Sequence, residues 1–149
     1  MKTFINKLFI SSCGWYIMTV VSFNITKMLA EKKKLAKGKI DIKNNVTIKN
    51  VSESKLAIDP KRVALKFDFE YVAKYEPELG VIEISGETIF LAEKQVAVET
   101  IKIWNKDKKI SGDFVNSLMN HILAKCNVQA VILSKDINLP APIPLPRIK

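Results

Sequence analysis

The side chains best suited to nucleophilic or metal chemistry in this chain belong to two cysteines and one histidine, Cys13, Cys126 and His121. A structural zinc site needs four soft ligands at close spacing, and neither cysteine belongs to a C-x-x-C pair. His121 lies beside Leu118 and Ile122 and has no acid or second histidine at helical spacing. Cys126 falls within an apolar helical stretch, which is typical of a small core residue. The sequence therefore predicts neither a metal site nor a nucleophile–base pair.

Other signatures of catalysis are also missing from the 149 residues. The sequence has no glycine-rich phosphate loop, no nucleophile elbow and no paired carboxylates in an apolar setting. We therefore predict that the protein is not an enzyme and that it uses no cofactor. Two cysteines in the whole chain fit a reducing compartment, so the expected location is the cytoplasm.

The strongest chemical bias of the sequence is positive charge, with 24 Lys plus Arg against 15 Asp plus Glu and a formal net charge of +9. Such an excess attracts nucleic acid, ribosomes or acidic surfaces through counterion release and long-range steering. A lysine-rich solvated surface is the simpler interpretation. The candidates for a basic patch form two clusters along the chain, which are Lys32, Lys33, Lys34, Lys37 and Lys39, and Lys106, Lys108 and Lys109.

The length and composition indicate one folded body that carries these residues. Hydrophobic residues make up 48% of the chain, and four of its six prolines lie at the C-terminus. A chain of this size buries one proper core. We therefore expect residues 18–149 to form a single α+β domain, with residues 138–149 as its C-terminal arm.

Residues 1–17 have the outline of a secretory signal, with Lys2 and Lys7 ahead of an apolar run that extends to about Val21. Polar residues and a glycine interrupt the run, which is shorter than the roughly 20 residues of a bilayer span and lacks an A-x-A cleavage site. Two interpretations stay open. The segment is an upstream extension from a misassigned start, with the working protein beginning near Met18, or it is a weak signal or anchor. No stable membrane span is expected.

After this segment the hydrophobic pattern repeats every two residues, as it does in half-buried β-strands. Val21, Phe23 and Ile25 alternate with polar residues and are expected to share a buried face. Residues 40–48 continue the alternation. They form either a hairpin that turns at Asn44 and Asn45 or one strand with a kink.

The longest alternation spans residues 65–75 and is followed by a break and another strand. Its apolar side chains fall on one face and are Leu65, Phe67, Phe69, Tyr71, Ala73 and Tyr75. Charged residues occupy the other face, which indicates an antiparallel sheet covered on one side and argues against RNA stacking on the aromatic residues. Pro77 and Gly80 supply a hairpin connection to residues 81–91, where Gly86 marks a bulge or a close approach of chains.

Beyond residue 91 the apolar period changes to that of an α-helix. A first helix within residues 92–109 is indicated by apolar residues at helical spacing, Ala97, Ile101 and Trp104. A second helix, capped by Ser111 or Asp113, is expected to carry a wide apolar stripe. The residues of this stripe are Phe114, Val115, Leu118, Met119, Ile122 and Cys126, continuing through Val131 to Leu133. The patterns together predict an α+β fold, a twisted antiparallel sheet of about four strands packed on one face by one long and one shorter helix, with a Pro-rich extended C-terminal arm.

Proline occupies every second position of this arm. In an extended chain the N–H groups of residues two apart point to the same edge, so the prolines remove donors from one edge alone. The apolar residues between them are expected to lie against the protein or a partner subunit, because exposing each one costs roughly 1.5–3 kcal/mol. The arm or interface candidates are Pro140, Pro142, Ile143, Pro144, Leu145, Pro146 and Arg147.

The order of these parts resembles the SecB-like chaperone family over about residues 19–149. The resemblance lies in the long alternating strands, in "GVIEISGETIFL", in the helix around "VNSLMNHILAKCNVQAVIL" and in the ending "INLPAPIPLPRI". It implies a strongly twisted antiparallel sheet against a long helix, in a cytoplasmic, oligomeric protein that holds unfolded chains on apolar grooves. The sequence also resembles a group of small archaeal proteins that share the "KYEP" turn and the "LPxPIPLP" ending.

Two functions from different classes stay open on the sequence. The first is a non-enzymatic SecB-like chaperone or protein-interaction module, a homo-oligomer that binds polypeptide clients or a protein partner through apolar surfaces. The alternative is a basic accessory protein that binds the ribosome or RNA through its lysine clusters. Binding of denatured polypeptide would favour the first function, and nucleic-acid affinity that falls steeply with salt would favour the second.

Overall fold

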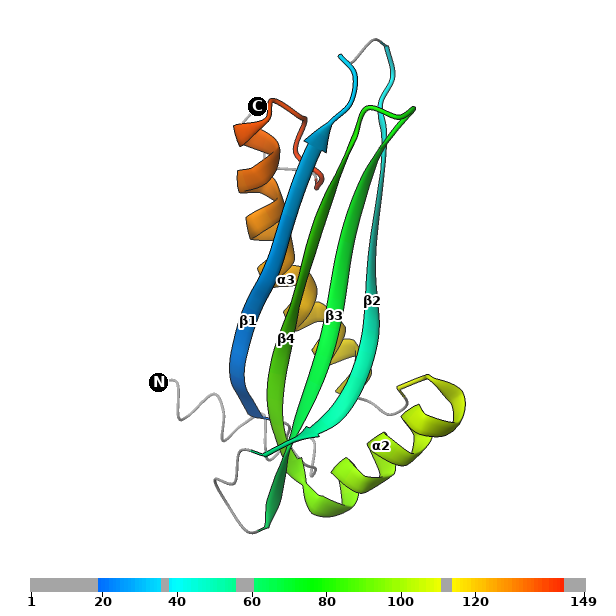
Figure 1. Ribbon diagram of the computed structural model, residues 1–149, viewed down its shortest axis with the longest axis vertical. Coiled ribbons are helices and arrows are strands. Elements are labelled where there is room, and N and C mark those ends of the chain that lie inside the picture. Colours follow the sequence, from blue (N-terminus) through cyan, green and yellow to red (C-terminus); the bar gives the residue numbers. More distant parts are fainter. Residues whose placement is uncertain (1–18, 36–37, 56–60, 111–113, 144–149) are drawn as a thin grey trace, which may run out of the picture.

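A computed structural model of the chain describes residues 19–35, 38–55, 61–110 and 114–143, which form one four-stranded sheet with two helices on one face (Figure 1). The elements are β1 (Thr19–Lys32), β2 (Asp41–Ser54), β3 (Arg62–Glu76), β4 (Gly80–Glu93), α2 (Lys94–Asp107) and α3 (Phe114–Asp136). Neighbouring strands are antiparallel, in the order β1-β4-β3-β2. The predicted α+β class, with a longer and a shorter helix on one face, is confirmed.

Several sequence-based predictions lie outside the described residues. These are the role of residues 1–17, the helix caps Ser111 and Asp113, the basic-patch residue Lys37, and the arm residues Pro144, Leu145, Pro146 and Arg147. They stay predictions.

The central strands β3 and β4 carry the core, because each places apolar side chains on the helix side of the sheet at every second residue. The six predicted side chains of β3 are at most 1% exposed. Across the hairpin, Ile82 faces Ala73, Ile84 faces Tyr71 and Phe90 faces Leu65. We call the side that carries these residues the inner face. The outer face carries half-exposed charged residues, as the alternation predicted.

The two edge strands differ in detail from the prediction. Val21 was expected on the buried face, but the register shifts between Val20 and Ser22 and leaves Val21 37% exposed. Phe23 and Ile25 do pack against the core. β2 runs straight through the predicted turn at Asn44 and Asn45, so the hairpin alternative is wrong and the single irregular strand is confirmed. Its irregularity is a register shift between Ile48 and Asn50, where Lys49 is the extra residue of a bulge. The residues before and after the bulge stay paired with β3.

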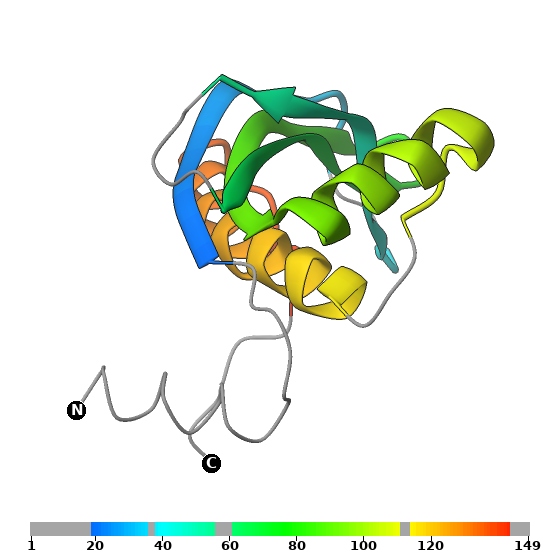
Figure 2. The same cartoon turned by 90° about the horizontal axis from the view of Figure 1, so that it is seen from below.

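The sheet bends at one row, where a glycine removes bulk from the inner face. Gly86 pairs with Phe69 on one side and with Ile25 on the other. A Cβ at Gly86 would lie 2.9 Å from Phe69 Cζ and 2.9 Å from Ile25 Cα, so β1 and the ring approach as closely as a glycine allows. Both edge strands bulge beside this row, at Thr26 and Lys49. Bulges increase local bending and twist, which fits the curvature of the sheet around α3 (Figure 2). The predicted special role of Gly86 is confirmed.

The helices cover different parts of the inner face. α2 lies across one end of the sheet and buries Ala97 and Trp104. α3 runs along the inner face and buries Leu118, Ile122 and Cys126 completely. The buried stripe then continues at the same spacing of four through Ala130 and Ser134, whereas the predicted continuation, Val131 to Leu133, is half-buried or exposed. The stripe keeps this spacing because a helix that crosses a sheet presents successive i, i+4 positions to it.

Candidate functional site: apolar surfaces and an arm on the inner face

Of the nucleophilic and metal-binding candidates, Cys126 lies in the core, His121 is half-buried, and Cys13 lies outside the described residues. Cys126 is fully buried, and burial raises the pKa of its thiol to about 12, so it is a protonated core residue as predicted. The His121 ring makes edge contacts with Phe23 and Phe90, and its Nε2 has no hydrogen-bond partner in the described part of the chain. Burial, and then the positive charge of Lys125, lowers the pKa of His121. Within the described ranges, no three His, Cys, Asp or Glu residues gather as they would around a metal ion.

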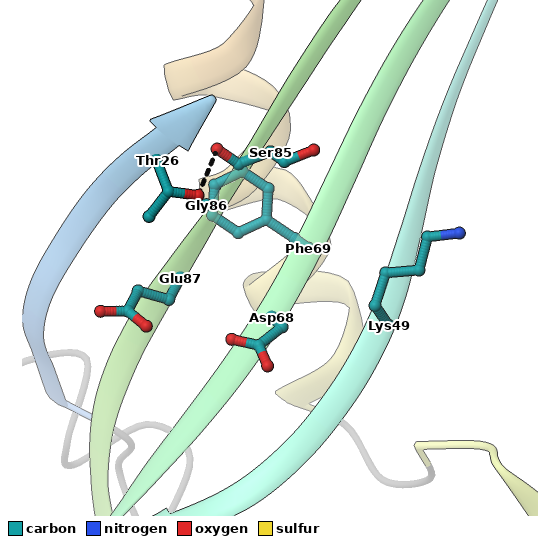
Figure 3. A pocket seen from close by; sticks show the side chains of 7 residues that line it. All are labelled: Thr26, Lys49, Asp68, Phe69, Ser85, Gly86 and Glu87. Carbon is teal, nitrogen blue, oxygen red and sulfur yellow. Dashed lines mark hydrogen bonds between the residues drawn. The ribbon is translucent and has the colours of Figure 1, made fainter. Parts of the chain in front are cut away.

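A shallow polar pocket on the outer face lies at the bend of the sheet (Figure 3). It is lined by Thr26, Lys49, Asp68, Phe69, Ser85, Gly86 and Glu87. The Thr26 hydroxyl donates to the Ser85 carbonyl at 3.3 Å, while Asp68 and Glu87 face each other in the strand register. Glu87 also pairs with Lys66 at 3.6 Å. The pocket follows from the bulges of the two edge strands at Thr26 and Lys49.

The outer face carries ion pairs between neighbouring strands. Lysine and glutamate side chains on neighbouring strands approach within 3.5–3.6 Å in four pairs, which are Lys27–Glu83, Lys43–Glu76, Lys49–Glu70 and Lys66–Glu87. Exposed pairs of this kind add little stability each. Their effect is to offset lysine charge with glutamate charge over the described part of this face.

The two predicted lysine clusters lie at opposite ends of the molecule (Figure 1). Lys32, Lys33, Lys34 and Lys39 lie where β1 meets the β3–β4 turn, and Lys32 pairs with Gly80 in the register. The second cluster lies at the C-terminal end of α2 and consists of Lys106, Lys108 and Lys109. α2 starts where β4 ends, at the opposite end of β4 from the β3–β4 turn. Lys108 lies over the Trp104 ring, 5.6 Å from its centre. The clusters therefore do not combine into one basic patch.

α3 carries a second apolar stripe on the side opposite its buried one. Ala124, Val128 and Ile132 follow one another at a spacing of four, and Val128 and Ile132 are 62% and 47% exposed. The sequence-based prediction treated the apolar residues of this helix as one wide stripe. Separating the two i, i+4 series, 118–122–126–130 and 124–128–132, would have revealed the uncovered side.

The edge strand β1 also carries an exposed apolar side chain on the helix side of the sheet. α3 and the turn that follows it each have one contact with β1, because the His121 ring packs against Phe23 and the Lys32 ammonium donates to the Asn138 carbonyl. Both views show the second half of α3 beside β1 (Figures 1 and 2). Met28, which is 50% exposed, lies between these two contacts. Because Met28 pairs with Ile84 in the register, its side chain belongs to the inner side of β1.

The C-terminal arm begins where α3 ends and crosses the inner face. Asn138 has a positive φ of 56°, which Asn tolerates, and the Leu139 N–H donates back to the Ser134 carbonyl at 2.8 Å. Leu139 and Pro142 are buried and Ile143 is half-buried, whereas Pro140 is exposed. Residues 139–143 join no strand, so the described part of the arm crosses the sheet instead of pairing with an edge.

Three side chains from three strands hold the arm by its carbonyl groups. Lys32 Nζ donates to the Asn138 carbonyl at 3.3 Å, Tyr75 Oη to the Pro140 carbonyl at 2.7 Å, and Asn44 Nδ2 to the Pro142 carbonyl at 2.8 Å. Burial raises the pKa of Tyr75 to about 12, and Ser134 opposes part of this rise, so the phenol remains a donor at neutral pH. The sequence-based prediction placed Tyr75 in the core and Asn44 in a possible turn. Nothing in their local pattern signals contacts with residues about 65 and 98 positions away.

We compared the sequence and the fold with those of known proteins. The sequence matches no family model, and no curated protein matches it. The fold is similar to that of the SecB-like chaperone Rv1957 of Mycobacterium tuberculosis, solved in complex with a ChAD peptide from the HigA1 antitoxin Rv1956. The TM-score is 0.53 and the identity 8%, over 99% of both chains. A protein of unknown function from Streptococcus agalactiae aligns over 88% of this chain and 99% of that chain, with 13% identity and a TM-score of 0.48. The likeness to the chaperone shows a SecB-like fold.

Proposed function

We propose that this protein is a non-enzymatic SecB-like chaperone or protein-interaction module that holds unfolded polypeptide or partner segments on apolar surfaces. The observation that carries the proposal is the second apolar stripe of α3, because a solvated helix face has no structural reason to repeat Ala124, Val128 and Ile132 at a spacing of four. The fold supports it, since the similar SecB-like chaperone is described in complex with a peptide.

A homo-oligomer in the cytoplasm is part of this proposal. β1 and β2 each leave one backbone edge without a strand partner among the described residues, and such edges are common sites of association. No helix in the described ranges is long and apolar enough to cross a bilayer. Sedimentation equilibrium of the full chain tests the assembly, and a monomer at every concentration would contradict it.

The function is tested with a permanently unfolded polypeptide, reduced and carboxymethylated α-lactalbumin carrying a fluorophore. We expect the full chain to raise its fluorescence anisotropy with a low-micromolar Kd. The double variant Val128→Glu with Ile132→Glu should weaken binding roughly tenfold or more, because it places charge on the apolar stripe. The matched control, Ser117→Glu with Asn120→Glu, adds the same charge at exposed polar positions of the same helix.

Salt separates apolar binding from simple charge attraction. The α-lactalbumin probe is acidic and this chain is basic, so ionic binding would be lost between about 0.15 M and about 0.5 M NaCl. Binding that survives the higher salt concentration and depends on Val128 and Ile132 supports the proposal. Binding that disappears with salt, or that the two double variants weaken equally, would refute it.

A further inference from the structure

The arm contact is built from side-chain donors that recognise main-chain acceptors. Lys32, Tyr75 and Asn44 belong to β1, β3 and β2, and their contacts form a line across the inner face from one edge strand to the other. The accepting carbonyls belong to Asn138, Pro140 and Pro142, which are two residues apart. Asn138 belongs to the turn that ends α3, with a φ of 56°, so Pro140 and Pro142 supply the two contacted carbonyls of the non-helical segment that follows. The surface therefore holds a non-helical segment by main-chain carbonyls two residues apart.

Little in these contacts depends on the arm's own side chains. Any extended polypeptide presents carbonyls two residues apart, and the hydrogen-bond donors of the surface bind those atoms without reading sequence. Proline suits the positions because it lacks the N–H that would otherwise need an acceptor, and because its fixed φ favours an extended chain. The surface should therefore accept other extended segments that contain proline.

Apolar contacts complete the surface and set its size limits. Leu139 is 7% exposed, and its Cδ1 lies 3.2 Å from the place that a Cβ on Gly80 would take. Pro142 is buried, and Ile143 is half-buried beside it. A ligand must therefore offer apolar side chains of about leucine and proline size at these positions.

We propose that this part of the inner face is a binding site for an extended, apolar, proline-containing segment of another polypeptide, and that the chain's own arm occupies it as an intramolecular competitor. The proposal rests on the proposed polypeptide-binding function and adds a location, a ligand class and a means of regulation. A client segment gains the site when the arm leaves it.

The competition between arm and peptide can be measured as a change in peptide affinity. A tethered arm acts at an effective concentration in the millimolar range, and a free peptide binds only during the fraction of time that the arm is away. Hydrogen bonds and apolar contacts of the kind seen here should keep the arm docked roughly 90–99% of the time, so its release should raise peptide affinity roughly 10- to 100-fold.

The test uses the full chain and a synthetic peptide with the sequence of residues 138–149, NLPAPIPLPRIK, labelled at its N-terminus. Pro142→Asp places a charge at a buried arm position and should release the arm without altering the sheet. Pro140→Asp places the same charge at an exposed position of the arm and is the matched control. Anisotropy should show tighter peptide binding by Pro142→Asp than by the wild type, and wild-type affinity for Pro140→Asp.

A second substitution shows whether the peptide uses the same donors. Adding Tyr75→Phe to Pro142→Asp removes one hydroxyl and should reduce the gained affinity roughly fivefold. If circular dichroism shows that Pro142→Asp does not fold, Ile143→Asp replaces it, because this position is half-buried and follows the contacted Pro142 carbonyl.

Equal affinity of the wild type and the released variants would overturn the competitor role, and absence of peptide binding by all of them would overturn the site. A gain in affinity that Tyr75→Phe leaves unchanged would place the peptide elsewhere and overturn the assignment as well. Failure of the chaperone proposal is seen separately, in the α-lactalbumin assay, where the wild type would show no salt-resistant binding.

Discussion

Replacing Gly86 with alanine should destabilise the protein strongly although it adds a single methyl group. The new Cβ would lie 2.9 Å from Ile25 Cα and 2.9 Å from Phe69 Cζ, and closer still to the Asn24 carbonyl oxygen. Two of these atoms belong to the backbone of β1 and cannot rotate away, so β1 must shift or separate from β4. Overpacking typically costs about 1–3 kcal/mol, and contact with backbone on one side and a buried ring on the other places the cost at about 3 kcal/mol.

For a chain of this length each kcal/mol lowers the Tm by about 2–4 °C, so the loss should be about 6–12 °C. Thermal unfolding followed by far-ultraviolet circular dichroism measures it. Ser85→Ala is the control, because Ser85 adjoins Gly86 but faces the half-exposed outer side, and its change should stay within about 0.5 kcal/mol. The truncation Phe69→Leu in the Gly86→Ala background should not restore the Tm, because the clash with β1 remains. A Tm of Gly86→Ala within about 2 °C of the wild type would refute the account of the bend.

Two further changes test the packing of α3. Leu118→Ala should lower the free energy of unfolding in urea by about 2–5 kcal/mol, because Leu118 is fully buried, whereas the exposed Asn120→Ala should change it by less than about 0.5 kcal/mol. The lowered pKa of His121 means that the unfolded chain takes up a proton near pH 6.5 while the folded chain resists it. Its contribution to stability should therefore be complete above about pH 6.5 and decline as the pH falls below that value, by at most about 1.4 kcal/mol per pH unit. Urea titrations at about pH 7.5 and about pH 5.5 measure the decline, and an unchanged decline in His121→Gln would show that another group causes it.

The parts of the fold that were predictable are those in which local pattern and burial agree. The alternation of residues 65–75 identified the core face of β3 without error, because a strand between two neighbours has one face for the helices and one for solvent. Gly86 was recognisable as a special position, since glycine weakens the interior of a strand and usually marks a bulge or a close approach of chains there. Pro77 and Gly80 likewise marked the turn that joins β3 to β4.

The parts that were missed depend on register and on contacts far apart in sequence. The bulge after Val20 moves Val21 off the buried face, and no residue type in "TVVSF" marks where the extra residue lies. The role of Asn44 depends on an arm almost 100 residues later, and that of Tyr75 on a carbonyl 65 residues later. The alternating prolines indicated that one edge of the arm lacks donors. They carried no sign that side chains would bind the carbonyls while the arm crossed the strands.

The distribution of charge indicates that the lysine clusters and the apolar surfaces would bind different kinds of partner. One lysine cluster lies beside the β3–β4 turn, and the other lies at the far end of α2, which starts from the opposite end of β4. A strand of 14 residues spans about 45 Å, so the two ends of the sheet are several times the Debye length of about 8 Å apart at physiological salt. Each cluster therefore acts alone, with three or four described lysines, and the ion pairs of the outer face keep the surface between them nearly neutral. A nucleic acid that contacts one cluster gains no help from the other. Its affinity should depend steeply on salt and should survive substitution of the second cluster, whereas binding of an extended polypeptide should depend on the inner face and on α3.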